Sequence, residues 1–250
     1  TSGLALPRPL VQALNWPAIR AKVYLNGVVT LVDGEALSAG SPVGDIKALE
    51  KQRNDDPSLD HLTPVKELFV DQLVAADFIL ISRADLLSNN DLEEIETEIS
   101  EKAGICTPIL RVANGKVQPS LILGLKQDDH LAFDDSSLSD NHDLENHHHL
   151  KVLSNTIRIE ALIDRTSIEA LLPELAIIHQ ILRLKGRCWL PGKTIPLQLQ
   201  MVGSRLNSWF EAVPHSVWTP KKGGLDVVVL SLDEVTPEAI CELVERISIK

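Results

Sequence analysis

The sequence predicts an α/β protein with two folded domains and a connecting linker. Three observations carry this prediction. Short apolar strands alternate with amphipathic helices before residue 128, which is typical of a parallel sheet covered by helices. A polar segment then breaks the pattern, and several strand-like runs follow one another after it. We therefore expect a parallel-sheet domain over 1–127, a linker over 128–152 and a C-terminal α+β domain with an antiparallel sheet over 153–250.

The expected elements of the first domain follow this alternation. A helix begins at the prolines Pro7 and Pro9, because proline suits the first turn of a helix. The run Phe78 to Ser82 is almost wholly apolar, which is typical of a strand buried on both faces of a parallel sheet. The other expected elements are strands over 22–32 and 108–112, helices over 65–76 and 91–103, and a long loop or insertion with a short helix over 40–64.

The C-terminal domain begins with a strand over 157–163 and a helix over 167–182, where apolar residues recur at helical spacing. Turn residues then separate three strand-like runs, and a final strand and a closing helix complete the domain. These later elements are expected over 183–190, 195–202, 205–210, 225–232 and 237–247. Consecutive strands without intervening helices favour an antiparallel sheet.

Composition excludes several classes of protein. With 44% hydrophobic and 24% charged residues, the 250-residue chain is neither collagenous nor coiled-coil nor wholly disordered. It has no run of about 18 apolar residues, so we expect no membrane partner. The net charge of −11 opposes nucleic acid as a partner through phosphate repulsion. Three widely spaced cysteines fit a reducing compartment, so a cytoplasmic location is expected.

The linker concentrates acidic residues and histidines. Between Asp128 and His149 lie seven Asp or Glu residues, no Lys or Arg, and five of the eight histidines. Neutral imidazole is a common ligand of Zn, Co, Ni and Cu ions, and neighbouring carboxylates raise the local cation concentration. The candidate metal ligands are His142, His147, His148 and His149. A plain solvated connector explains the same composition, and the sequence leaves these two interpretations open.

The four residues Ser82-Arg83-Ala84-Asp85 come at the end of the apolar strand. Ligands of open α/β sheets bind at the carboxyl ends of strands, which suits a base-reading loop. A carboxylate at Asp85 can accept two hydrogen bonds from the N1 and N2 groups of guanine, and adenine lacks that pair of donors. GTPases usually carry Asn-Lys-x-Asp here, whereas this chain has Ser and Arg in the first two positions. Taken alone, the four residues favour a surface turn with a helix cap over guanine recognition.

The segment Gly186 to Thr194 looks like a phosphate-binding loop but does not meet its requirements. Such a loop has four residues between its first glycine and Gly-Lys-Thr, and five occur here. It also leads into a helix, whereas Thr194 leads into a strand-like run. We therefore predict a hairpin turn at this place.

Five segments along nearly the whole chain carry a family resemblance. They are Thr1 to Pro7, similar to the end of a Glu-x-x-Gly-Leu-Ala switch segment; Val28 to Gly34, similar to the strand after it; Asp71 to Asp85, similar to the approach to a guanine-reading loop; the histidine-rich linker; and Leu182 to Gly192, similar to a C-terminal domain signature. In this order they resemble the CobW-type GTPases, metallochaperone-like P-loop proteins associated with cobalamin biosynthesis and metal homeostasis. The resemblance implies that the first domain is a remnant of a P-loop GTPase sheet domain.

The resemblance also implies roles for individual residues. Asp85 would read guanine, Arg83 would flank the base in place of Lys, and Ser82 would stand where Asn supports the loop. Gly3 would lie near the γ-phosphate. The implied cofactors of the intact parent are GTP with Mg²⁺, and the implied metals are Co²⁺ or Zn²⁺.

The long insertion indicates a branch of the family. Gln52-Arg53, Asp56 to His61 and Glu67 to Phe69 resemble the cobalamin-pathway branch more than the shorter zinc-associated paralogues. That branch implies GTP-dependent delivery of cobalt toward a partner such as a cobaltochelatase. A zinc-directed paralogue is one alternative. A non-enzymatic module, which buffers metal through its linker and binds a partner through its C-terminal domain, is another.

The resemblance places several motifs before Thr1: the phosphate loop, the magnesium-binding hydroxyl, a Cys-x-Cys-Cys metal motif and the switch glutamate. We therefore expect an N-terminally truncated member of the family. Without phosphate-binding amides, a lysine and Mg²⁺, phosphoryl transfer loses its main electrostatic stabilisation. The parent is expected to be a GTPase, and this chain alone is not expected to hydrolyse GTP.

Overall fold

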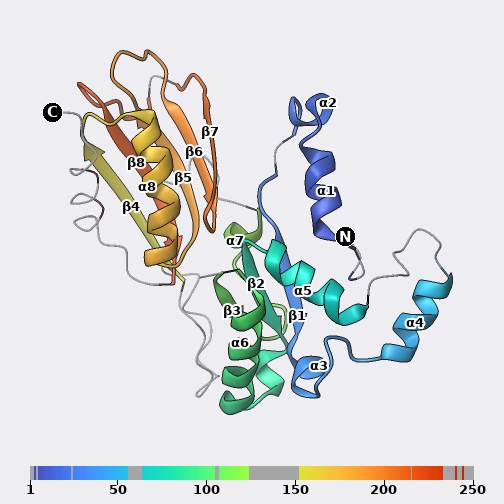
Figure 1. Cartoon of the computed structure of the whole chain (residues 1–250). Helices are drawn as coiled ribbons and strands as arrows, with labels where there is room; N and C mark the ends of the chain where they lie inside the picture. Colours follow the sequence, from blue (N-terminus) through green and yellow to red (C-terminus); the bar gives the residue numbers. More distant parts are fainter. Residues whose placement is uncertain are drawn as a thin grey trace. The chain divides into compact units, whose positions relative to one another are not determined.

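In the computed structural model the chain forms two compact units, residues 1–117 and 118–250, and each is described by itself (Figure 1). The structure describes residues 3, 5–23, 25–55, 64–104, 107–123, 152–214, 216–232, 240 and 244, without the side chains of 52 and 53. One unit holds a parallel sheet and the other an antiparallel sheet, which confirms the predicted fold class. The expected domain boundaries at 127 and 152 stay predictions, because residues 124–151 lie outside the described ones.

The first unit is built on three parallel strands, β1 (Val29–Asp33), β2 (Phe78–Ser82) and β3 (Ile109–Arg111), in the order β1-β2-β3. β1 and β2 pair along their whole length, so that Asp33 lies opposite Ser82. Both strands therefore end at the same edge of the sheet, and β3 runs parallel beside β2. The predicted strand over 22–32 is shorter in the structure, where the paired part begins at Val29, opposite Phe78.

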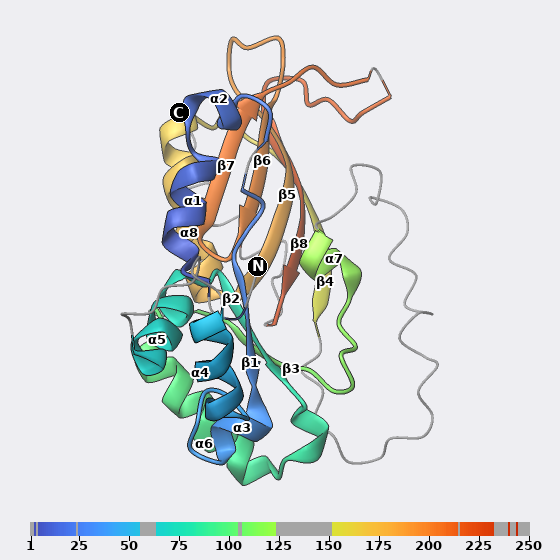
Figure 2. The same ribbon diagram turned by 90° about the vertical axis from the view of Figure 1, so that its right-hand side faces the viewer.

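Helices cover this sheet, and Figure 2 shows α5 and α6 beside it. The elements are α1 (Pro7–Leu14), α2 (Pro17–Arg20), α3 (Gly34–Ser38), α4 (Ile46–Asp55), α5 (Val65–Ala75) and α6 (Asn89–Lys102). Ser88 and Asp91 form a capping box that fixes the start of α6. Apolar side chains of α5, α6 and the strands form the core, among them Leu73, Leu92, Ile95, Ile99, Val32, Ile79 and Ile81.

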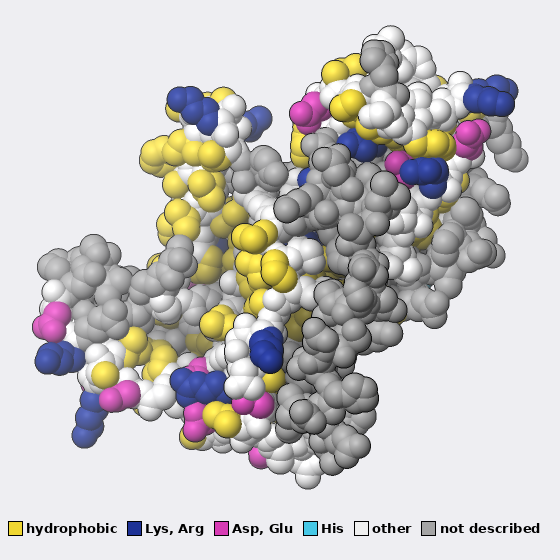
Figure 3. All heavy atoms as spheres, turned by 180° about the vertical axis from the view of Figure 1, so that it is seen from behind, with side chains coloured by type: hydrophobic (Ala, Val, Ile, Leu, Met, Phe, Trp, Pro, Cys, Tyr) yellow, Lys and Arg dark blue, Asp and Glu magenta, His cyan; other side chains and the backbone are white. Residues whose placement is uncertain are grey.

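The helix α1 differs from α5 and α6, because none of its residues is buried. Its Leu10 is 45% exposed, and Trp16, just before α2, is 63% exposed. Apolar side chains on α1 and α2 appear in yellow in Figure 3. Proline at the first turn of both helices agrees with the predicted start at Pro7.

The second unit contains a five-stranded sheet in the order β4-β8-β5-β6-β7, in which every neighbouring pair is antiparallel. Its elements are α7 (Pro119–Leu123), β4 (Leu153–Glu160), α8 (Arg165–Ile178), β5 (Ile181–Trp189), β6 (Leu197–Val202), β7 (Arg205–Phe210) and β8 (Gly224–Ser231). The segment after Trp189 turns back into β6, with Gly192 at a φ of 72°. The predicted hairpin turn is therefore confirmed.

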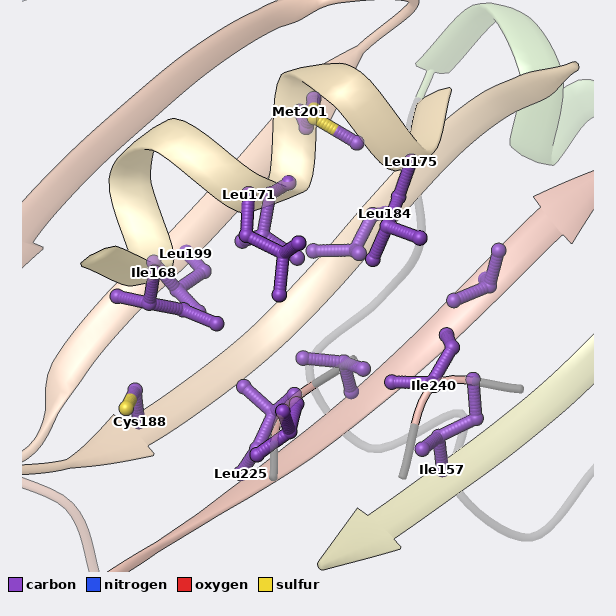
Figure 4. Close-up of a cluster of buried hydrophobic side chains, with 14 of the residues drawn as sticks. Ile157, Ile168, Leu171, Leu175, Leu184, Cys188, Leu199, Met201, Leu225 and Ile240 are labelled. Carbon is purple, nitrogen blue, oxygen red and sulfur yellow. The ribbon is translucent and has the colours of Figure 1, made fainter. Parts of the chain in front are cut away.

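The helix α8 packs its apolar face on one side of this sheet (Figure 4). Ile168 and Leu175 are at most 1% exposed and face strand residues such as Leu184 and Leu225. Of the predicted closing helix over 237–247, Ile240 and Val244 are described, and both are buried in this core. This continuous apolar contact holds the second unit together.

Glycine is required where β5 and β8 come closest. A Cβ atom on Gly186 would lie 2.1 Å from the carbonyl oxygen of Asp226 and 2.5 Å from the Cα of Val227. Both obstacles are backbone atoms, which cannot turn aside as a side chain can. The close strand contact therefore depends on the missing side chain.

Two isoleucines of α8 provide a matched test of this packing. Ile168 is 0% exposed and Ile178 is 63% exposed. Ile168→Ala should lower the free energy of unfolding by about 2–5 kcal/mol, because it removes buried methyl groups and leaves a cavity. Ile178→Ala should change it by about 0.5 kcal/mol or less. Urea denaturation followed by circular dichroism measures both, and equal losses would contradict the packing described.

The start of α8 predicts a dependence of stability on pH. The carboxylate of Asp164 accepts two hydrogen bonds from Ser167. One comes from the Ser167 hydroxyl, and the other comes from the Ser167 backbone N–H at 3.0 Å. Both bonds lower the pKa of Asp164. The stabilisation is present above the unfolded pKa and is lost as pH falls through the lower, folded pKa. Between about pH 5 and pH 3, wild-type stability should therefore fall more steeply than that of Asp164→Asn. Parallel curves of unfolding free energy against pH would refute this role.

Candidate functional site

The carboxyl edge of the parallel sheet gathers the polar residues of the first unit that the motif analysis singled out. Arg83 follows β2 in the left-handed conformation, with φ 57° and ψ 29°, and a short 3-10 helix (Ala84–Leu86) comes next. The N–H of Ala84 donates to the carbonyl of Val112 at 3.2 Å, which attaches this loop to the end of β3. Side chains after β2 are therefore fixed at the edge where open α/β sheets bind ligands.

Ser82 and Arg83 both bind the end of β1. The hydroxyl of Ser82 donates to the carbonyl of Val32 at 2.9 Å. The guanidinium of Arg83 contacts Glu35 Oε2 at 2.5 Å and Asp33 Oδ2 at 3.1 Å. The hydrogen bond to Glu35, followed by the charge of Asp33, raises the pKa of Arg83. A planar guanidinium can contact two carboxylates at once, which a lysine ammonium does less precisely.

Asp33 has two functions at this edge. Its Oδ1 accepts the N–H of Ala36 at 3.3 Å and caps α3, while its Oδ2 contacts Arg83. The helix begins next to β2: a Cβ atom on Gly34 would lie 2.8 Å from the carbonyl oxygen of Ser82. The start of α3 and the loop after β2 are therefore held together as one structure.

Asp85 contacts the turn after β3, whereas Arg83 contacts the end of β1 and the start of α3. Its Oδ1 accepts the backbone N–H of Asn114 at 3.1 Å. Asn114 and Gly115 have φ values of 51° and 69°, the left-handed region that this turn requires. Within the part of the chain that the structure describes, Asp85 makes no other hydrogen bond. Its carboxylate is half-buried and can accept further hydrogen bonds from a ligand.

The motif analysis missed Asn114, Asp33 and Glu35. The Asn-Gly pair one residue after the predicted strand over 108–112 is a turn signal that could have pointed to Asn114. Asp33 and Glu35 are about fifty residues from Arg83 in sequence, and the parallel register alone brings them together. Their contact could not be predicted from spacing.

The other predicted site residues lie elsewhere. The carbonyl of Gly3 accepts from Gln72 Nε2 at 2.8 Å, and the carbonyl of Gln72 accepts from the hydroxyl of Thr30 at 2.9 Å. Thr30 belongs to the beginning of β1, so Gly3 is not grouped with Ser82, Arg83 and Asp85. Its role near a γ-phosphate stays a prediction.

The predicted metal ligands His142, His147, His148 and His149 lie outside the described residues. Among the described ranges, three or more His, Cys, Asp or Glu side chains do not come together in a group that could hold a metal ion. In the same ranges we find no helix with the length and apolar character needed to cross a bilayer.

These observations define an α/β protein with polar side chains fixed at the carboxyl edge of a parallel sheet and a separate antiparallel C-terminal unit. The chain belongs to the CobW family. Residues 1–107 match the CobW/HypB/UreG nucleotide-binding domain, and residues 152–245 match the C-terminal domain of the cobalamin synthesis protein CobW. The family resemblance expected from the sequence is thereby confirmed.

Two curated relatives are both named zinc chaperone CobW. The protein from a Sinorhizobium species is 33% identical over 246 residues, which cover 96% of this chain and 68% of the relative. The protein from Pseudomonas aeruginosa is 36% identical over 212 residues, which cover 84% of this chain and 56% of the relative. Among solved structures, the Zn(II)-bound YjiA GTPase from E. coli is similar over 99% of this chain and 69% of its own, at 16% identity and a TM-score of 0.35.

Proposed function

We propose that this chain is part of a GTP-dependent metallochaperone and supplies the surface that reads the guanine base. The observation that supports this most is the position of the half-buried Asp85 carboxylate at the carboxyl edge of the sheet. Membership of the CobW family supports nucleotide binding at the same unit. Transfer of a metal ion to a partner enzyme is the activity proposed for the whole protein.

Each residue at the edge has a defined task in this proposal. Asp85 accepts hydrogen bonds from the N1 and N2 groups of guanine, and the N–H of Asn114 orients its carboxylate. Arg83, held by Asp33 and Glu35, lies along the base. Ser82 fastens the loop to β1 through the carbonyl of Val32. Adenine is discriminated against because it cannot donate both hydrogen bonds to Asp85.

The phosphates and Mg²⁺ are a separate matter. The 250 residues contain no Gly-x-x-x-x-Gly-Lys-Ser/Thr motif, and the described residues hold no group of three or more His, Cys, Asp or Glu side chains that could bind a metal ion. The phosphate-binding loop that would hold the β- and γ-phosphates is therefore not among these 250 residues. GTP hydrolysis belongs to the proposal for the whole protein.

The cargo proposed is a divalent metal ion captured by the histidine-rich segment 128–149. Both curated relatives are named zinc chaperones, which favours Zn²⁺. The insertion over 40–64 is the feature that favours Co²⁺ and a cobaltochelatase as the receiving partner. Imidazole and carboxylate ligands bind several divalent ions, so the ligand types do not choose between the two.

Base recognition can be tested without phosphates. Titration of the 250-residue chain with guanosine should shift the amide NMR signals of Asn114 and its neighbours, and adenosine should not. Asp85→Ala should weaken guanosine binding by about tenfold to a hundredfold, because it removes hydrogen bonds to a charged acceptor. Asp55→Ala, which removes an exposed acid of α4, is the matched control. Unchanged guanosine affinity in Asp85→Ala would rule out the site.

Metal capture can be tested by calorimetry with Zn²⁺ and Co²⁺ in competition. The chain should bind both near neutral pH and weaken below about pH 6, because histidine protonates near 6.5. Combined replacement of His142, His147, His148 and His149 by Asn should abolish this binding. His179→Asn should leave it unchanged, since this histidine caps the end of α8. Metal binding without any guanosine binding would favour the non-enzymatic buffering module over the GTP-dependent chaperone.

A further inference from the structure

The antiparallel sheet has one face that α8 does not cover. Successive side chains of a strand point to opposite faces, and Leu184 and Cys188 of β5 point toward α8 (Figure 4). Arg187 therefore points to the opposite face. Arg183 and Lys185 share this face with it, so three cations occupy alternate positions of β5 in a chain whose net charge is −11.

A row of polar residues crosses this face at the level of Arg187. The strand pairings place Arg158 opposite Asp226, Asp226 opposite Arg187, Arg187 opposite Gln198, and Gln198 opposite Trp209. We call these five residues the Arg187 row. All five strands contribute one side chain to it, so its composition is set by the register of the whole sheet.

One nitrogen of the Arg187 guanidinium is buried without a hydrogen-bond partner in the described part of the chain. The residue is 4% exposed, and its buried Nε has no hydrogen-bond partner among the described residues. Buried polar groups in proteins are nearly always hydrogen-bonded. Such an exception in a folded protein calls for an explanation, and a ligand that accepts from this N–H is one.

Asp226 is the acid nearest in register, but it is already engaged. Its Oδ1 and Oδ2 accept from Arg158 Nε and Nη2 at 3.1 and 3.4 Å. The guanidinium of Arg158 in turn lies 5.0 Å from the ring centroid of Trp218, which contacts Trp189 edge to face at 5.4 Å. Asp226 therefore pairs with Arg158, and among the described residues it makes no hydrogen bond or ion pair with Arg187.

The other side of the row offers no replacement. Gln198 is 5% exposed, and its Nε2 donates to the backbone carbonyl of Glu211 at 3.4 Å. The Glu211 carboxylate accepts the indole N–H of Trp209 at 2.8 Å. Neutral Gln198 cannot balance a positive charge, and no ion pair with Arg187 occurs in the described part of this unit.

We propose that Arg187 anchors an anion-binding site on this sheet face, and that the ligand is a carboxylate group. A carboxylate brings two acceptor oxygens in the plane that a guanidinium fork requires. It also brings one negative charge, which matches the net charge of +1 that two arginines and one aspartate give the row. A phosphate would bring nearly two. The carboxylate comes either from an acidic polypeptide or from a small free acid, and this site is independent of the guanine-reading edge.

The side-chain Nε–H NMR signal of Arg187 tests the proposal directly in the 250-residue chain. At constant ionic strength, hexaglutamate or free glutamate should shift this signal saturably. Hexaglutamine should not shift it. If the dissociation constant per carboxylate is at least tenfold lower for hexaglutamate than for free glutamate, the bound carboxylate belongs to an acidic polypeptide. Equal affinities would identify a small acid.

Variants separate a ligand site from a merely unfavourable buried charge. Arg187→Gln should weaken hexaglutamate binding at least tenfold, and Arg187→Lys should weaken it less, because the charge remains without the planar fork. Arg165→Gln should leave the affinity unchanged, since Arg165 is exposed and paired with Glu169 on α8. These affinities are measured by the same titration of the folded variants.

Two results would overturn the proposal. One is an Arg187 Nε–H signal that no carboxylate shifts in the wild-type chain, a measurement that does not depend on any variant folding. The other is a shift by inorganic phosphate at the same affinity as by glutamate, since that would exclude a site selective for carboxylates.

Discussion

The parallel register of β1 and β2 is the constraint on which the candidate guanine site depends. Asp33 lies opposite Ser82 because the two strands pair residue for residue from Val29 and Phe78 onward. A shift by one residue would turn every side chain of β1 to the other face and separate Arg83 from its two carboxylates. The apolar runs of β1 and β2 fix this register through burial, so the core positions the polar edge.

Elements with a single strong signal could be predicted well from the sequence. The run Phe78–Ser82 has the expected bounds because a five-residue apolar run with Phe and two Ile is too short for a typical helix and suits a buried strand. The helix expected over 167–182 instead ends at Ile178, and Ile181 begins β5. Helical spacing continues through the apolar residues, and Gln180, at a φ of 46°, is the break that periodicity does not reveal.

For both candidate sites, the sequence could predict only those contacts that join residues close together in the chain. The motif located Asp85 correctly at the end of a strand, since that needs only the strand and the loop after it. The partners of Arg83 come from another strand, and Arg187 lacks one because five strands align in a particular order. Such relationships arise from tertiary packing, and no local pattern encodes them.

The two arginines also show why exposure decides what a charge indicates. Arg83 is 52% exposed and has two carboxylates, so water screens its ion pairs and they contribute little to stability. Their value is geometric, since they fix one orientation of the guanidinium. Arg187 is 4% exposed with an unpartnered Nε, so its burial opposes folding and the α8 core must offset it. Its cross-strand neighbours are the polar Asp226 and Gln198, and a carboxylate ligand on this face would supply the acceptor that the Arg187 Nε lacks.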